Sequence, residues 1–94
     1  MYKDLDPILH QQLRLAVISW LAENVKSDFN ILREVTGATS GNLSVQITKL
    51  QEAGYIEVNK GFKGKYQHTT VKITRKGFKA FESYVETLKG YFPK

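Results

Sequence analysis

The chain has 94 residues, 41% of them hydrophobic, which suits one domain (residues 1–94) with a single core and leaves no room for a separate catalytic domain. It contains no cysteine, which excludes disulfides and thiolate metal sites. The net charge of +5 is unevenly distributed, because residues 58–81 contain seven Lys and Arg and no Asp or Glu. This segregation predicts a polyanion as partner, with an ordinary solvated charged face as the alternative.

The first predicted helix begins at Asp6 and Pro7, because aspartate accepts hydrogen bonds from free amides and proline is preset for the first helical position. The following stretch, ILHQQLRLAVISWLAEN, is apolar on more than one side. Its main stripe contains Leu9, Leu13, Val17, Trp20 and Leu21, and it is widened by Ile8, Leu15, Ala16 and Ile18. Such a helix either lies deep in the core or presents a second face to another chain.

Two shorter helices follow. Ser27 or Asp28 can cap the first of them, and Gly37 ends it. Thr39 or Ser40 can cap the next helix, whose apolar positions are Leu43, Ile47, Leu50 and Ala53. The four-residue connection GATS between two short helices is typical of a helix-turn-helix.

After Gly54 the hydrophobic period changes from helical to alternating, which predicts two strands, YIEVNK and TTVKIT. The stretch between them, KGFKGKYQH, is then the tip of a β-hairpin whose glycines supply turn dihedrals with positive φ. An RNA-binding GxxG clamp would need helices on both sides, and a nucleotide-binding phosphate loop would need a different spacing.

Thr74 can cap a final helix over about residues 75–92. Phe78 and Phe81 are expected in the core, packed on the first helix. The apolar positions beyond them are Val85, Leu88, Tyr91 and Phe92. An exposed strip of this length is unfavourable for a monomer, so these residues predict a homodimer interface that also uses the spare face of the first helix.

Two stretches, LREVTGATSGNLSVQITKLQEAGYIEVNKGFKG and TTVKITRKGFKAF, resemble the small winged-helix DNA-binding domains of prokaryotic transcriptional regulators. These are relatives of the multiple-antibiotic-resistance and arsenical-resistance repressors. The resemblance covers about residues 8–82, and its most specific parts are GNLSVQITKLQEAGYI and ITRKG. It implies an α+β, mostly helical fold: a winged helix-turn-helix with three helices, a two-stranded wing hairpin and a C-terminal dimerisation helix.

The resemblance implies that the helix at residues 39–53 lies in the major groove and that residues 61–68 form the wing. If Leu43, Ile47 and Leu50 face the core, the remaining side of that helix points outward. The predicted DNA contacts on the helix are Ser40, Asn42, Ser44, Val45, Gln46 and Lys49, and those on the hairpin are Lys60, Lys63, Lys65, Tyr66 and His68. Amides can pair with adenine, hydroxyls suit phosphates or either base, and lysine can contact guanine or phosphate.

The sequence therefore predicts a sequence-specific regulator that binds double-stranded DNA and acts as a dimeric repressor; the alternative is a winged-helix docking module for proteins. No catalytic motif is present, so we do not expect an enzyme. The two histidines, His10 and His68, lie in different elements, so we expect neither a metal nor another cofactor. The acidic start MYKDLDP and the absence of a long apolar run predict a soluble cytoplasmic protein, and no small-molecule effector can be identified.

Overall fold

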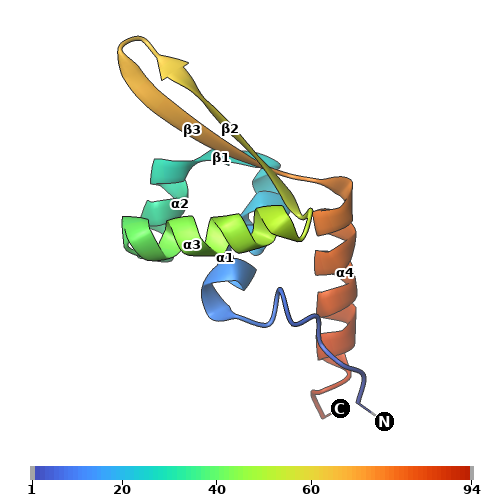
Figure 1. Cartoon of the computed structure of the whole chain (residues 1–94). Helices are drawn as coiled ribbons and strands as arrows, with labels where there is room; N and C mark the ends of the chain where they lie inside the picture. The colour runs from blue at the N-terminus through green and yellow to red at the C-terminus, as the bar shows by residue number, and fades with distance from the viewer. Residues whose placement is uncertain (1, 94) are drawn as a thin grey trace.

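The computed structural model, which describes residues 2–93, has the predicted winged-helix architecture with one additional strand (Figure 1). The elements, in chain order, are α1 (Gln12–Asn24), β1 (Lys26–Asp28), α2 (Phe29–Thr36), α3 (Ser40–Glu52), β2 (Ile56–Lys63), β3 (Tyr66–Ile73) and α4 (Arg75–Lys89). The three strands form one antiparallel sheet in the order β1-β3-β2. The hairpin of β2 and β3 projects from the helical body, and α4 leaves the sheet in the opposite direction (Figure 1).

Helix α1 lies at the centre of the helical body, where it contacts α2, α3, α4, β1 and β3. Four of its residues are buried: Leu13, Val17, Ile18 and Leu21. They pack in one core with residues of the other three helices and of strands β2 and β3. These include Leu32, Leu43, Leu50, Ile56, Val71 and Tyr84. Most of the main stripe of α1 is therefore used within the chain, whereas Leu15, Ala16 and Trp20 are only partly buried.

The start of α1 differs from the prediction. Asp6 does accept hydrogen bonds from backbone amides, with its Oδ1 2.8 Å from the amide nitrogen of Ile8, but it caps a separate turn at residues 7–10. The helix itself begins at Gln12, because the side chain of Gln11 caps it by accepting from the amide of Arg14 at 2.7 Å. A side-chain cap five residues further along thus replaces the cap predicted at Asp6.

The helix-turn-helix forms as predicted, with Gly37 ending α2 and the Thr39 side chain capping α3 by accepting from the amide of Asn42. The sequence did not reveal β1, which lies between α1 and α2 and pairs with β3 through Lys26, Ser27 and Asp28. Three polar residues carry no alternating pattern, so only the available edge of β3 makes this segment a strand. It closes the sheet against the body of the protein.

The hairpin strands are longer than predicted. Gly61 pairs with His68 and Lys63 with Tyr66, so the expected loop at residues 61–68 is mostly paired strand. Only Gly64 and Lys65 form the turn, and of the two glycines in GFKG only Gly64 has a positive φ, +66°. Main-chain hydrogen bonds extend the ladder here without a buried apolar face, which is why hydrophobic alternation did not predict it.

Helix α4 is capped by Thr74, as predicted, but it turns a different face to the core. Its buried residues are Gly77 and Tyr84, whereas Phe78 is 41% exposed and Phe81 is only partly buried. A Cβ atom at Gly77 would lie 2.2 Å from the carbonyl oxygen of Tyr55. This close backbone contact sets the rotation of α4 and turns Phe78 outward, so the prediction of a core Phe78 is wrong.

No helix among residues 2–93 is long and apolar enough to cross a lipid bilayer.

Candidate nucleic-acid interface

The outward face of α3 carries five of its six predicted DNA contacts. Its inner face is fixed by Leu43, Ile47 and Leu50, which are buried in the core. The exposed residues are Ser40, Asn42, Ser44, Val45 and Lys49. Val45 is the apolar residue among them and is 51% exposed. The helix therefore presents short polar groups, one apolar group and one cation on a rigid support.

Gln46, the sixth predicted contact, is buried, with only 9% of its surface exposed. Its Oε1 accepts a hydrogen bond of 2.6 Å from Nη1 of Arg14, and its Nε2 donates one of 3.2 Å to Oδ1 of Asn42. The expectation that Gln46 points outward is therefore wrong. Position 46 adjoins Ile47 and Leu43 around the helix, and the half-buried Arg14 guanidinium supplies the polar partner that allows an amide to turn inward.

Arg14 holds this network to the rest of the protein. Its Nε donates to the backbone oxygen of Ile8 at 2.6 Å, in the turn that precedes α1. The chain of contacts thus runs from that turn through Arg14 and Gln46 to Asn42. Because Asn42 Oδ1 already accepts a hydrogen bond, its Nδ2 group is left to donate outward, which orients this side chain before any ligand arrives.

The predicted hairpin contacts lie on different faces of the sheet. Alternation along the strands puts Lys60 on the same side as the core residues Val58 and Val71, toward α3, and puts Lys63 and Tyr66 on the opposite side. Lys65 lies in the turn. The hairpin therefore presents cations on two faces and at its tip.

His68 lies on the outer face of β3, away from the tip. Its Nε2 is 2.8 Å from Oδ1 of Asp28 in β1, yet the ring N–H is not directed at the carboxylate, so the contact is ionic when the imidazole is protonated. About a third of each of the two side chains is exposed. His68 thus ties the base of the hairpin to β1. Residues 2–93 contain no group of three His, Cys, Asp or Glu side chains that could hold a metal ion.

A groove of about 290 Å³ separates α3 from the hairpin. Besides Ser44 and Lys60, its lining includes four polar residues that the sequence did not single out: Thr48, Gln51, Gln67 and Thr69. Phe62 follows on the same side of β2 and is 79% exposed. Extending the strand alternation through GFK would have identified Phe62 as an exposed aromatic on the face that looks toward α3.

Comparison with known proteins agrees with this geometry. Residues 13–92 match the model of the family described as winged helix DNA-binding domain. The chain belongs to this family. Over 79 residues it is 35% identical to an uncharacterised protein of Methanocaldococcus jannaschii, covering 83% of this chain and 85% of the relative.

Two solved structures show the same fold. A transcriptional regulator homologue from Pyrococcus horikoshii OT3 has a TM-score of 0.83 and 27% identity, over 89% of this chain and 83% of that one. Reduced AbfR bound to DNA has a TM-score of 0.76 and 18% identity, over 86% of this chain and 58% of that one. The resemblance to winged-helix regulators that the sequence suggested is confirmed.

In this winged-helix domain, the C-terminal end of α3 is held by Tyr55, in the turn that follows the helix. The hydroxyl of Tyr55 donates to Oδ2 of Asp6, and its backbone oxygen accepts from the amide of Thr74 at 3.0 Å. Burial, with the hydrogen bond to Asp6 and the negative charge of Asp6 as further causes, raises the pKa of Tyr55 to about 12. The phenol therefore stays neutral, and one residue joins the N-terminal turn, α3 and the start of α4.

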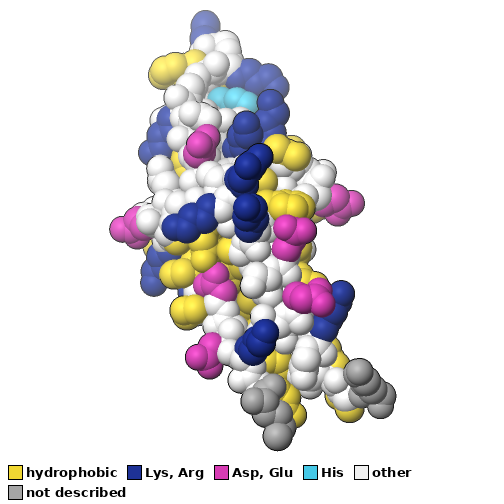
Figure 2. All heavy atoms as spheres, turned by 90° about the vertical axis from the view of Figure 1, so that its right-hand side faces the viewer, with side chains coloured by type: hydrophobic (Ala, Val, Ile, Leu, Met, Phe, Trp, Pro, Cys, Tyr) yellow, Lys and Arg dark blue, Asp and Glu magenta, His cyan; other side chains and the backbone are white. Residues whose placement is uncertain are grey.

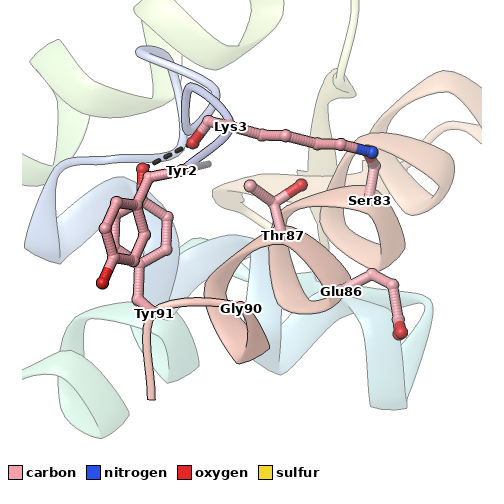
Figure 3. A pocket seen from close by; sticks show the side chains of 7 residues that line it. All are labelled: Tyr2, Lys3, Ser83, Glu86, Thr87, Gly90 and Tyr91. Atoms are coloured by element: carbon pink, nitrogen blue, oxygen red, sulfur yellow. Dashed lines mark hydrogen bonds between the residues drawn. The ribbon is translucent and has the colours of Figure 1, made fainter. Parts of the chain in front are cut away.

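The four predicted dimer residues of α4 differ in exposure. Leu88 packs against the core and Val85 is partly buried, whereas Phe92 is 65% exposed. Tyr91 stacks on Tyr2, with ring centroids 5.0 Å apart, and its hydroxyl donates to the backbone oxygen of Lys3 (Figure 3). The N-terminal segment of the same chain therefore covers part of the strip.

Proposed function

We propose that this winged-helix domain is a sequence-specific transcriptional repressor that binds duplex DNA as a dimer, reads the major groove with α3 and anchors on phosphates with its basic hairpin. The proposed role is recognition, without catalysis. The observation that carries it is the exposed surface of α3, where Asn42 is oriented by a buried network and Ser40, Ser44 and Lys49 are also exposed. A rigid helix with short polar groups suits the reading of base edges.

The hairpin supports a different part of the proposal. Lys60, Lys63 and Lys65 are exposed and lack an acidic partner in residues 2–93. Long flexible cations of this kind contact phosphates of any sequence and add affinity without specificity. Reduced AbfR, which shares the fold, has been solved bound to DNA, which supports duplex DNA as the partner.

A dimer would explain the apolar surface that remains on α4. Phe78, Phe81 and Val85 line a groove of about 510 Å³ together with Ala22 of α1, and Ser19 and three glutamates, Glu23, Glu82 and Glu86, complete its lining. With Phe92 this surface would lie in the interface, while Leu88 and Tyr91 would support it from within the chain. Two-fold symmetry would set two copies of α3 about 34 Å apart, the spacing of successive major-groove half-sites. A monomeric mass in light scattering at micromolar concentration would exclude this interface.

Selection of bound fragments from a random duplex pool tests the function. We expect one enriched motif with two inverted half-sites whose centres lie about 10 base pairs apart. Binding without any enriched motif would reject base reading by α3. No binding to random duplex at low salt would instead favour a protein-docking module.

A further inference from the structure

The basic residues of segment 58–81 do not gather at the hairpin tip alone. Lys72, Arg75 and Lys79 lie at the other end of the segment, on β3 and the first two turns of α4. Lys26 of β1 joins them, because it pairs directly with Lys72 across the sheet. All four side chains are exposed, and dark blue side chains cover the start of α4 and the adjoining strands in Figure 2. We name these four residues the shoulder.

The strand residues of the shoulder, Lys26 and Lys72, face away from the outward side of α3. Val71 and Ile73 point into the core from β3, so Lys72 between them points out of the opposite face of the sheet. Helix α3 packs on α1 and on β2 from the core side. A duplex that lies along the outward face of α3 is therefore separated from Lys26 and Lys72 by the body of the domain.

The charges of the shoulder are unfavourable for folding. Lys26 and Lys72 are like charges on directly opposite residues of antiparallel strands, an arrangement that destabilises a sheet. Arg75 occupies the first turn of α4, which contains no acidic residue, where the helix dipole favours anions. None of the four has an acidic side chain within 4.0 Å in the part of the chain that the structure describes. Glu57 lies directly opposite Lys72 on the other neighbouring strand and offsets part of the repulsion between Lys26 and Lys72, although Glu57 and Lys72 form no ion pair within residues 2–93.

We propose that the shoulder is a second phosphate-binding surface, which holds a segment of duplex DNA other than the one contacted by α3 and the hairpin. A polyanion relieves the repulsion within the shoulder, and the charges of three lysines and one arginine suit sequence-independent contact with phosphates. One molecule can then bridge two duplex segments. The inference rests on the proposed DNA binding of this domain but concerns a separate surface.

Bridging is measured with two 20-base-pair duplexes of random sequence, one carrying a donor dye and the other an acceptor, mixed with the full chain at low salt. We expect energy transfer to appear with wild-type protein and to fall at least about tenfold in K26Q/K72Q/R75Q/K79Q. Binding of a single duplex should stay within about threefold of wild type. The salt dependence of bridging should have a log–log slope of about −3 to −4, since each phosphate contact contributes about −0.9.

Two control variants test the role of charge. K26R/K72R/K79R keeps the charge and should bridge like wild type. R75Q/K79Q leaves the sheet unchanged, and the slope of log bridging against log salt should fall by about half. This variant tests the inference if the fourfold variant does not fold. Lys76 is left intact, because its ammonium lies 5.8 Å from the centre of the Tyr55 ring and its aliphatic stem packs on Gly54.

A dimer that carries one duplex on each copy of α3 would also bring two duplexes together. The hairpin variant K63Q/K65Q distinguishes this arrangement from bridging by the shoulder. Bridging that survives loss of the shoulder but is lost in K63Q/K65Q would overturn the inference and leave the proposed function intact. Wild-type binding to one duplex without any bridging would overturn it as well. Absence of all duplex binding would overturn both the function and the second surface.

Discussion

Helix α3 and the β2–β3 hairpin are both proposed to contact DNA, yet they are held in place by different forces. Leu43, Ile47 and Leu50 fix α3 in the core, and the Arg14–Gln46 network fixes one of its outward side chains. In the hairpin, residues 60–67 are all exposed, and only the strand ladder and the turn at Gly64 define their positions. Phe62 and Tyr66 are 79% and 80% exposed.

This difference separates two roles. Side chains on α3 have positions set by packing, which base recognition needs because hydrogen bonds are lost over small displacements. Side chains on the hairpin can adjust to phosphates, whose attraction is long-ranged and non-directional. Substitutions around α3 should therefore change folding and specificity, whereas substitutions in the hairpin should change affinity alone.

The largest expected effect on stability is at the junction that joins α3 to α4. Gly77→Ala should lower the free energy of unfolding by about 3 kcal/mol, because the new Cβ would meet the backbone oxygen of Tyr55 at 2.2 Å. Gly41→Ala, on α3 itself with no atom within 4 Å of the new Cβ, should instead raise it by up to about 1 kcal/mol. Urea denaturation measures both, and similar values for the two would contradict the close contact at Gly77.

The next largest change in stability is expected at Gln46, and it distinguishes a structural role of this side chain from base reading. Gln46→Ala should cost about 1–3 kcal/mol in the free energy of unfolding, because the half-buried guanidinium of Arg14 loses its acceptor. Val45→Ala, one position away and exposed, should cost less than about 0.5 kcal/mol. Full stability of Gln46→Ala together with lost base discrimination would restore the role that the sequence suggested.

A smaller change in stability is expected at Tyr55, next to α3. Tyr55→Phe should cost about 1 kcal/mol at neutral pH through the lost hydrogen bond to Asp6. The raised pKa of Tyr55 also stabilises the folded state fully below pH 10, the pKa of a free phenol, and this contribution disappears as the pH rises toward about 12. Wild type should therefore lose more stability than Tyr55→Phe between pH 10 and 12 in denaturation experiments.

Tyr66→Phe in the hairpin is the matched control, since this ring is exposed. It should follow the wild-type curve at every pH. If the unfolding free energies of Tyr55→Phe and wild type run parallel above pH 10, the phenol of Tyr55 does not stabilise the junction.

The smallest expected effect on stability is in the hairpin itself. Lys63→Ala with Lys65→Ala should leave the free energy of unfolding within about 0.5 kcal/mol, because neither side chain is buried or paired. It should weaken binding to all duplexes and flatten the slope of log affinity against log salt by up to about two units. An unchanged slope would remove the hairpin tip from the DNA interface.

The sequence predicted the parts of the fold that carry local signals. Gly37, Thr39 and Thr74 mark helix ends through capping chemistry, and the alternation around Ile56 and Val71 marks the strands; all of these are confirmed. Features that depend on tertiary contacts were missed. Strand β1 exists because β3 offers an edge, and the rotation of α4 follows from a backbone contact between residues far apart in sequence.

The candidate site shows the same division. Helical periodicity identified the outward residues of α3, but it could not reveal that Arg14, 32 positions earlier in the chain, draws Gln46 inward. Charge counting found the basic segment, but the strand register was needed to show that Lys60 and Lys72 lie on opposite faces of the sheet. Whether the exposed residues of α3 read bases remains a prediction of this account.

The ratio of affinities for a selected DNA site and a random duplex tests the division of roles most directly. Asn42→Ala should lower this ratio by about 5- to 150-fold, equivalent to about 1–3 kcal/mol, while Lys63→Ala with Lys65→Ala should keep it within about twofold and weaken both affinities. Equal losses on selected and random DNA for Asn42→Ala, or a collapse of the ratio in the hairpin variant, would contradict the account.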